Sequence, residues 1–555
     1  MSPSPAEPQL SACAPWGAAA LLAACGGGGS GSQLGSDSAK DGSALLAVAL
    51  TDEDASRLLA QAAFGATDTH IDRVKALGAR AWLDEQFAIP RTEGHYSTML
   101  SQGLAVEANL NGFNGFENTV WRKLIASPDV LRQRMVLALS EIFVVSMQGL
   151  PVPWRGFVMA AYVDLLETHA FGNYRQLLEA VTLSPAMGVY LNMRGNRKAN
   201  AATGRVPDEN YAREVLQLFS VGLVELNLDG SARLDGRGQP QETYSQETIT
   251  GLARVFTGWD YDRFVRTDPG HAQRPMVVNS ANHESAEKRF LGTTVPANTP
   301  AAEGLAMALD AIAQHPNVGP FIGRQLIQRL VCSHPSAAYV SRVAAVFNNN
   351  GQGVRGDLQA VLSAVLLDPE ARRAPADGQN SRGMLREPVV RFVQWARTFG
   401  VTSPTGLWNV GNLSDPATRL GQSPFRAPSV FNFFRPGYVP PNSALGEQGI
   451  TAPEFQITNE STVVGWANFA QSFVVSGVAE LRPNYSAELA LASDAPALVR
   501  RVALLLAANA LSQDTLALIT QAVNSISAAT AAGRNNRVYA AVHLVLCAPE
   551  YLIQI

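Results

Sequence analysis

The stretch Thr51–Gly65, TDEDASRLLAQAAFG, shows the pattern that recurs along most of the chain. Thr51 precedes three acidic residues. This indicates a helix N-terminus, because a threonine hydroxyl caps backbone N–H groups and the helix dipole favours acids in the first turn. Leu58, Leu59 and Phe64 then follow at helical spacing. We therefore predict a helix with one apolar face that ends at the glycine.

The same spacing continues outward from this stretch to the end of the chain, so helices dominate the prediction. Further helical segments are predicted at residues 70–88, 117–147, 155–182, 207–222, 245–257, 301–314, 317–331, 337–348, 356–367, 384–399, 454–475, 494–509, 512–528 and 536–547. Short extended pieces are expected near 273–279 and 288–294, and two long irregular stretches, 227–243 and 402–450, interrupt the helices. The expected fold is mainly α, a multi-helix globular body with long irregular loops and at most a small β-hairpin.

Composition narrows the class of protein. The chain has 555 residues, of which 46% are hydrophobic and 16% are charged, and its net charge is −4. This length allows a sizeable buried core. Because there is no basic excess, we expect neither nucleic acid nor an anionic membrane surface as a partner. The sequence contains no HExxH, GxSxG, GxxxxGKS or CxxC motif and indicates no cofactor.

The first 50 residues differ from the rest. The apolar run Ala14–Ala24 is too short to span a bilayer, and a small residue before Cys25, with Gly and Ser after it, is typical of a bacterial lipoprotein signal. No Lys or Arg precedes Lys40, which a misassigned start codon explains. The alternative is a Gly/Ser-rich leader with a chance cysteine.

This pattern predicts the organisation of the chain. We expect a signal segment at 1–25 that leaves Cys25 lipidated, a flexible tether at 26–50, and a helical region at 51–552 that is subdivided near 402–450 in one alternative. The protein is then exported, as a periplasmic, outer-membrane or cell-surface lipoprotein. Its contact with the membrane is expected only through the lipid anchor.

The densest polar cluster is DENYARE at 208–214, followed by an apolar stretch. Helix geometry places Asn210 and Glu214 on one face, with Arg213 beside them. Polar groups on an otherwise buried helix need partners, so they either form a structural network or line a cleft that binds a ligand. Both interpretations stay open from the sequence.

Two more clusters contain residue types that are suited to a site. Ser245 fits the N-cap of a helix, and Glu247 falls in its first turn, where the helix dipole favours an acid. This structural role is enough to explain an acid at position 247. Trp259 follows a glycine and serves either as a buried plug at the helix end or as a stacking platform. His283 is a candidate base or metal ligand, and Lys288 is a candidate anion-binding residue, although a lone loop histidine is more often a surface hydrogen-bonder.

These clusters, in this order, resemble the bacterial family catalogued as domain of unknown function 1800. The resemblance covers most of residues 52–552, and its most specific pieces are NYAREVLQLF at 210–219 and TGW at 257–259. Where many relatives carry a His-Asn-His-like segment, this chain has LSEI at 139–142, so no role of those histidines carries over. The resemblance implies an exported protein, often encoded beside an exported sulfatase-like partner protein, and brings no established reaction.

Three functions are compatible with these residues. The first is a cell-envelope accessory protein that binds a partner protein or an extracellular polymer through its helical scaffold and the 402–450 stretch. The second is an extracytoplasmic hydrolase or transferase acting on a polymer, with Glu214 and His283 as acid and base and Arg213 or Lys288 holding an anion. The third is a metal-binding protein that uses the same carboxylates with His283.

Overall fold

The computed structural model describes residues 49–373 and 383–555. Helix α2 (Asp52–Ala62) begins as predicted, since the Thr51 hydroxyl accepts the Asp54 N–H and the Asp54 carboxylate accepts the Thr51 N–H. The helix ends three residues before Gly65, because the chain turns at Phe64, whose φ is 64°. Gly65 then lies so close to Gln394 that a Cβ would come within 2.8 Å of it. The glycine is therefore required by the packing of α2 against a later helix.

The remaining helices confirm a mainly α fold. In the first part of the chain they are α3 (Asp68–Leu77), α4 (Ala79–Ala88), α5 (His95–Ser101), α6 (Phe116–Ala126), α7 (Val130–Ile142), α8 (Arg155–His169), α9 (Tyr174–Leu183), α10 (Pro185–Tyr190), α11 (Asn210–Gln217) and α12 (Gln246–Val255). They continue with α13 (Ala301–Gln314), α14 (Val318–Leu330), α15 (Ala337–Asn348), α16 (Leu358–Leu367), α17 (Pro369–Arg372), α18 (Pro388–Thr398), α19 (Ala444–Glu447), α20 (Glu460–Ser476), α21 (Ser486–Ala490), α22 (Ala495–Ala507), α23 (Gln513–Asn524), α24 (Ala531–Cys547) and α25 (Pro549–Leu552). Short 3-10 turns are η1 (Glu107–Asn109), η2 (Ala201–Thr203), η3 (Pro269–Gln273) and η5 (Pro453–Ile457).

Three predicted helices are each divided into two in the structure. The segment 117–147 becomes α6 and α7, because Pro128 lacks the N–H and fixes the φ angle that a helix interior needs. The segment 70–88 breaks at Gly78, which has a φ of 79°. The segment 155–182 breaks before Asn173, whose side chain caps α9. For these three segments the apolar spacing predicted helix correctly but not where each helix ends. The predicted helix 384–399 begins later, because residues 384–385 form strand β5, and the short helices α5, α10, α19 and α21 were not predicted.

The strands are short and antiparallel. They pair β1 (Trp259–Asp260) with β2 (Val277–Val278), β3 (Lys288–Phe290) with β4 (Thr293–Val295), and β5 (Met384–Leu385) with β6 (Ile553–Gln554). Both extended pieces expected from the sequence are thus confirmed, and the second forms a hairpin. This hairpin packs on α12 at Gly251, where a Cβ would overlap the Arg289 carbonyl oxygen.

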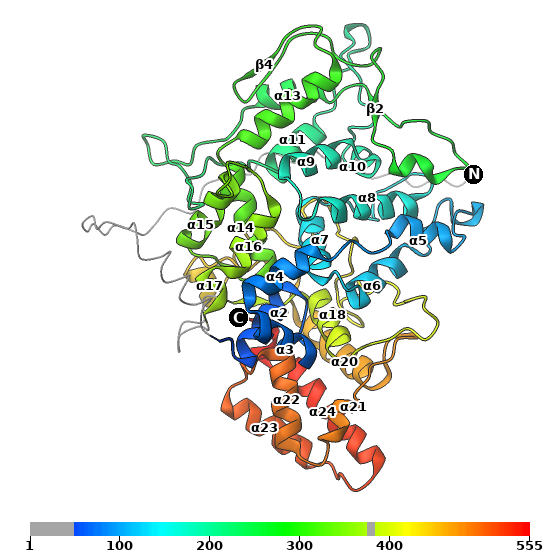
Figure 1. The fold of residues 1–555 in the computed structure, drawn as a ribbon. Helices are drawn as coiled ribbons and strands as arrows, with labels where there is room; N and C mark the ends of the chain where they lie inside the picture. The colour runs from blue at the N-terminus through cyan, green and yellow to red at the C-terminus, as the bar shows by residue number, and fades with distance from the viewer. Residues whose placement is uncertain (1–48, 374–382) are drawn as a thin grey trace, which may run out of the picture.

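One hydrophobic core runs through the molecule, with buried members from Ala55 to Tyr551. In Figure 1, α7 lies near the middle, α13 and the β3–β4 hairpin lie towards one end, and α21 to α24 lie at the other. Helix α2 packs on α22, so the start of the described chain lies against a helix from its C-terminal part. The buried charges discussed below lie on or next to α7, α14, α18 and η5.

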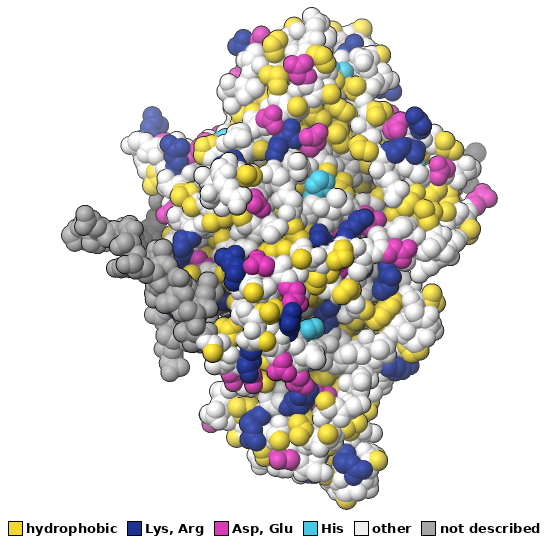
Figure 2. Space-filling model, in the orientation of Figure 1, with side chains coloured by type: hydrophobic (Ala, Val, Ile, Leu, Met, Phe, Trp, Pro, Cys, Tyr) yellow, Lys and Arg dark blue, Asp and Glu magenta, His cyan; other side chains and the backbone are white. Residues whose placement is uncertain are grey.

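The surface carries both signs of charge. Figure 2 shows basic and acidic side chains interspersed over the visible face of the body. Within residues 49–373 and 383–555, no helix combines the length and the apolar character needed to cross a bilayer. The aromatic segment of the 402–450 stretch packs mostly inward, with Phe425 and Phe434 buried and Phe431 exposed. It forms one wall of a cavity.

Candidate functional site

A cavity of about 580 Å³ opens between α7, α14 and residues 430–437; we call it the α14 cavity. Its wall is formed by Glu141, Ile142, Gln217, Leu218, Gly222, Leu223, Val224, Leu226, Gly230, Phe321, Arg324, Gln325, Gln328, Arg329, Val430, Phe431, Arg435, Pro436 and Gly437. Ligand pockets for small molecules have similar volumes and combine a largely apolar lining with a few polar groups. The α14 cavity fits both criteria.

One face of α14 supplies most of the polar wall. Phe321, Arg324, Gln325, Gln328 and Arg329 line the cavity and are spaced three, four, seven and eight residues from the first. This spacing places them on one side of a helix. Each turn of α14 therefore presents a charged or amide side chain to the same space.

A carboxyl group lies at the buried floor of the cavity. Glu141 is 6% exposed, and its Oε2 lies 2.9 Å from Nε of Arg329, which is 1% exposed. Burial raises the pKa of Glu141 well above its usual value, and a hydrogen-bonded neighbouring carboxyl, Glu387, raises it further. Arg329 and Arg134 act in the opposite direction. Burial and Glu387 together outweigh the two arginines, so the net effect is a raised pKa for Glu141.

A third carboxyl group extends this cluster towards η5. Glu454 is 2% exposed and accepts a hydrogen bond of 2.7 Å from Ser333. Burial is the largest cause that raises its pKa to about 7. Gln422 donates to Glu387 at 2.6 Å, and buried Arg134 donates to the Arg329 carbonyl. The cluster thus connects α7, α14, α18 and η5.

Two arginines at the cavity have no acidic partner within residues 49–373 and 383–555. Arg324 is partly buried, and no carboxylate within the described ranges lies within ion-pair distance of it. Arg435 is exposed at the rim, where its guanidinium covers the Phe431 ring at 5.2 Å. A partly buried guanidinium without an anion is unfavourable, because desolvation disfavours the charged form. Burial accordingly lowers the pKa of Arg324, and a bound anion would offset this cost.

Two amide side chains in the same wall also lack hydrogen-bond partners in the described chain. Nε2 of Gln325 and Oε1 of Gln328 are buried and have no hydrogen-bond partner among residues 49–373 and 383–555. The other end of the Gln328 amide donates to the carbonyls of Ser333 and Pro436, which fixes its orientation. One amide donor and one amide acceptor in the cavity wall therefore remain without a partner in the described chain, on the same wall as Arg324 and Glu141.

Of the residues predicted from the sequence, three lie on α11. Arg213 pairs with Glu209 at 3.3 Å, and the Asn210 N–H donates to Asp208. Glu214 is buried, and its Oε2 has no hydrogen-bond partner in the described chain. Burial raises the pKa of Glu214, while Arg213 opposes the shift.

Another group forms around the end of α12. The His283 ring nitrogen Nδ1 lies 2.8 Å from the Thr257 carbonyl and so carries the hydrogen, which leaves Nε2 as the acceptor. Nε2 of His283 and Nζ of Lys288 are both buried without a hydrogen-bond partner among the described residues. Burial lowers the pKa of each side chain. Trp259 is 4% exposed and plugs the helix end, whereas Glu247 is exposed on the first turn of α12.

The structure does not bring all the predicted residues into one pocket. Glu214 and His283 have different hydrogen-bond and charge neighbours, and neither lines the α14 cavity. Helix α11 reaches the cavity only through Gln217, one turn beyond Glu214. The residue of α11 that lines the cavity is therefore not one of those singled out from the sequence.

Sequence reasoning missed Glu141, Arg134, Arg329, Glu387 and Glu454. A signal was present for some of them. Arg134 and Glu141 are seven residues apart, and Arg329 stands in the apolar stretch FIGRQLIQRLV at 321–331. A charge inside an apolar helix needs a buried partner. The sequence could not identify that partner, because the partners come from other helices.

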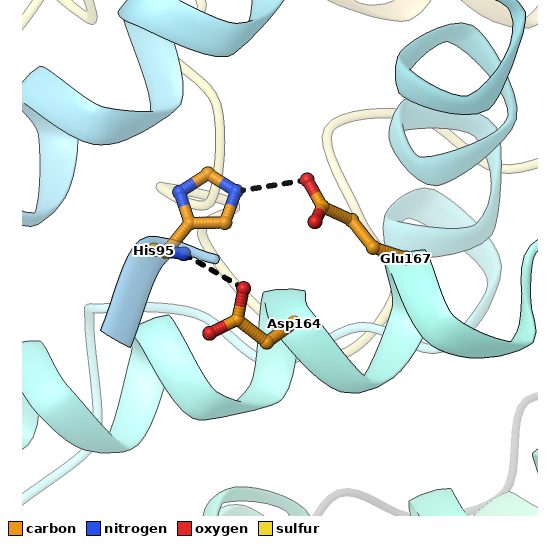
Figure 3. A group of neighbouring side chains, drawn as sticks. All are labelled: His95, Asp164 and Glu167. Carbon is orange, nitrogen blue, oxygen red and sulfur yellow. Dashed lines mark hydrogen bonds and ion pairs between the residues drawn. The ribbon is translucent and has the colours of Figure 1, made fainter. Parts of the chain in front are cut away.

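A second buried polar group includes His95, Asp164 and Glu167, whose candidate ligand atoms lie within 4.8 Å of one another. Figure 3 shows the His95 ring directed at Glu167 and the His95 backbone N at Asp164; both carboxylates come from α8. Glu167 is already bound by Lys123 at 2.6 Å and by Gln133 at 2.9 Å. Because the Lys123 ammonium occupies the place where a cation would bind Glu167, this group fits an ion-pair network better than a metal site.

Asp164 has a separate structural role in this network. Its two oxygens accept the backbone N–H groups of His95 and Tyr96 at 2.7 and 2.9 Å, and so cap α5. Gly94 precedes the helix, and a Cβ there would lie 2.7 Å from the Asp164 carboxylate. The glycine therefore allows α5 and α8 to approach.

The sequence profile of one family, described as "Protein of unknown function (DUF1800)", matches residues 57–553. No curated protein and no solved structure matches the chain. The matched region includes α7, α14 and η5, so the α14 cavity and the buried carboxyl cluster both lie inside it.

We expect Glu167→Gln to lower the free energy of unfolding by about 3–5 kcal/mol, because it leaves Lys123 buried without its counter-charge. Burial alone would raise the pKa of Glu167, but His95 and Lys123 outweigh it and lower the pKa to about 2. The stabilisation is therefore present above the unfolded pKa near 4.5 and is lost as the pH falls towards 2. Urea unfolding at pH 7 and at pH 3 measures both effects.

Asp310→Asn is the matched control, since it removes the acid of an exposed ion pair with Arg175 and should change stability by less than about 0.5 kcal/mol. Zinc or manganese ions added to the parent should leave the melting temperature unchanged. A metal-dependent rise that Glu167→Gln abolishes would contradict the ion-pair assignment.

Glu454→Gln should flatten the pH dependence of stability. A carboxyl whose folded pKa is raised contributes stability below the unfolded pKa of about 4.5, and this contribution is lost as the pH rises through about 7. The loss in the parent amounts to about 3 kcal/mol at 1.36 kcal/mol per pKa unit. Urea unfolding of parent and variant between pH 4 and pH 8 measures it.

The control is Glu303→Gln, an exposed acid on the first turn of α13. Glu303→Gln should show the same change of unfolding free energy with pH as the parent. An unchanged slope in Glu454→Gln would show that Glu454 ionises normally in the folded protein.

Proposed function

Because the chain belongs to the DUF1800 family, whose description states no function, we propose one from its geometry: an exported, lipid-anchored protein that binds a small anion-bearing ligand in the α14 cavity. The observation that carries this proposal is Arg324, a partly buried guanidinium in the cavity wall without a carboxylate partner in the described chain. A carboxylate or phosphate group on the ligand would supply the missing charge.

The rest of the wall defines the kind of ligand. The donor of Gln325 and the acceptor of Gln328 suit hydroxyl or amide groups. Phe321, Val430 and other apolar side chains line most of the remaining surface and suit a compact apolar or ring portion. The proposed ligand thus combines an anion, hydroxyl groups and an apolar face. A free acid and the charged end of an extracellular polymer share this chemistry.

Arg435 and Phe431 extend the site to its rim. The guanidinium and the ring lie against each other at the mouth of the cavity, and both are exposed. Stacked aromatic and arginine side chains provide a rigid surface with a small entropic cost of ordering. The segment 430–437 is fixed to α14 by the bond from Gln328 to the Pro436 carbonyl, so the rim and the wall keep their relative positions.

One observation favours a second candidate function, a hydrolase or transferase. Glu141 lines the cavity as a carboxyl group whose pKa burial raises, which is the state that a general acid requires. In this proposal a water or an acceptor hydroxyl bonds to the substrate as the bond to the leaving oxygen breaks, Glu141 donates a proton to that oxygen, and Arg329 stabilises the carboxylate that remains. The assignment of Glu214 and His283 as acid and base places the reaction near α11 and α12 instead. That assignment predicts that replacing Glu214 or His283 abolishes activity and that replacing Glu141 does not.

Binding is tested by calorimetry and thermal shift with phosphate, citrate, glucuronate and acidic oligosaccharides. We expect at least one to raise the melting temperature of the parent, and Arg324→Gln to weaken its binding roughly 10- to 100-fold, because hydrogen bonds to charged groups contribute about 1.5–3 kcal/mol. Arg237→Gln is the matched control on an exposed loop and should bind as the parent does. Binding that Arg324→Gln retains would contradict the proposed anion site.

Export and lipidation rest on the leader, and Cys25 lies outside the described residues. We expect a labelled fatty acid to be incorporated into the full chain in bacteria and Cys25→Ser to abolish the incorporation. Cys13→Ser removes the other leader cysteine and should remain labelled, because the apolar run Ala14–Ala24 precedes Cys25 and not Cys13. Labelling lost in Cys13→Ser instead would contradict the assignment of Cys25.

A further inference from the structure

An exposed apolar pair stands at the tip of the loop between β1 and η3. The tip reads Arg263-Phe264-Val265-Arg266, and all four residues are exposed. Phe264 is 45% and Val265 is 49% exposed. Adjacent large apolar side chains at a loop tip, with a cation on either side, mark a surface that meets another phase or molecule.

Ring contacts hold the tip in place. The Phe264 ring stacks on Tyr261, with centroids 5.3 Å apart and planes 18° apart, and it meets the edge of His271 at 5.0 Å. The guanidinium of Arg194 covers Tyr261 at 3.9 Å. Four side chains therefore form a stack that keeps Phe264 turned outward.

Hydrogen bonds from two side chains to backbone carbonyls fix both ends of the tip to the body. The Trp154 indole N–H donates to the Arg266 carbonyl at 2.8 Å, and the Arg274 guanidinium donates to the Arg263 carbonyl at 2.9 Å. Trp154 itself is buried, so it ties the tip to the start of α8. Because the tip is already ordered, a contact there costs little conformational entropy.

The charges of the loop leave the two tip arginines available. Asp260 is bound by Arg194 at 2.8 Å, and Asp262 lies 3.4 Å from Arg274 and 3.8 Å from Arg263. The third acid of the loop, Asp268, accepts the Gly270 N–H and caps η3.

Arg266 has no acidic partner among residues 49–373 and 383–555, and Arg263 is bound only loosely and is 84% exposed. The net charge of −4 for the whole chain does not prevent a local attraction. Salt screens charges that lie more than about 8–10 Å away.

We propose that this tip contacts an anionic phospholipid surface, with Phe264 and Val265 entering the interface and Arg263 and Arg266 binding lipid phosphates. The combination of an apolar pair with flanking cations matches the layered polarity of such a surface, in which phosphates lie above hydrocarbon. Two exposed apolar side chains and two cations give weak, reversible binding. The tip therefore orients a protein already held near a membrane and does not anchor it alone.

The test uses the full chain with Cys25→Ser, which removes the acyl anchor, and vesicle flotation. We expect binding to vesicles of phosphatidylcholine with phosphatidylglycerol and much less to phosphatidylcholine alone. Val265→Asp should reduce the bound fraction about fivefold or more, since it places a charge in the apolar layer. Arg266→Gln should reduce it about fivefold and weaken its salt dependence.

Val464→Asp is the matched control. Val464 is a 58% exposed apolar residue on α20, far from the tip in sequence, and its replacement should leave vesicle binding unchanged. Equal melting temperatures show that the variants fold.

Three results would overturn the proposal: no binding of the parent to anionic vesicles, equal binding to neutral ones, or equal loss in Val464→Asp. If the parent does not bind anionic vesicles but an exported protein binds saturably at the same tip, the tip is a site for a protein partner instead.

Discussion

Charge that is buried away from water organises the middle of this protein. Arg134, Arg329, Glu141 and Glu387 are each less than 10% exposed and lie within one cluster. An isolated ion in such a place is strongly unfavourable, so each group must be paired, hydrogen-bonded or neutral. These residues lie on or next to α7, α14 and α18, and the Glu141–Arg329 ion pair links α7 to α14.

The protein meets the same constraint in two different ways. Around Glu167, Lys123 balances the charge, His95 and Gln133 contact the carboxylate as well, and neither carboxylate oxygen is left without a partner. Around the α14 cavity the balance is incomplete, because burial raises the pKa of Glu141 and Arg324 lacks an anion within the described chain. The first arrangement is what stability alone requires. The second is what a ligand site requires, since part of the charge balance is left for the ligand.

Much of the fold could be predicted from the sequence, and the reason is local. The cap at Thr51, the cap at Ser245 and the extended pieces that became β2 and the β3–β4 hairpin depend on neighbouring residues. The candidate site was less predictable. Glu214 and His283 share the residue types of a site, yet each faces its own local surroundings. Gln217 faces the cavity because of how α11 packs on the rest of the body, which helix spacing does not specify.

The sequence by itself determined that the chain is mainly helical, where most helices lie, and that it belongs with a family of proteins of unknown function. These properties follow from spacing and composition, which act over a few residues or over the whole chain. Only the tertiary structure decided that Glu141, Arg329 and Glu454 lie together and that one face of α14 lines a cavity. The physical reason is that desolvation depends on what surrounds a side chain in space. For this cluster, the surroundings come from segments more than a hundred residues apart.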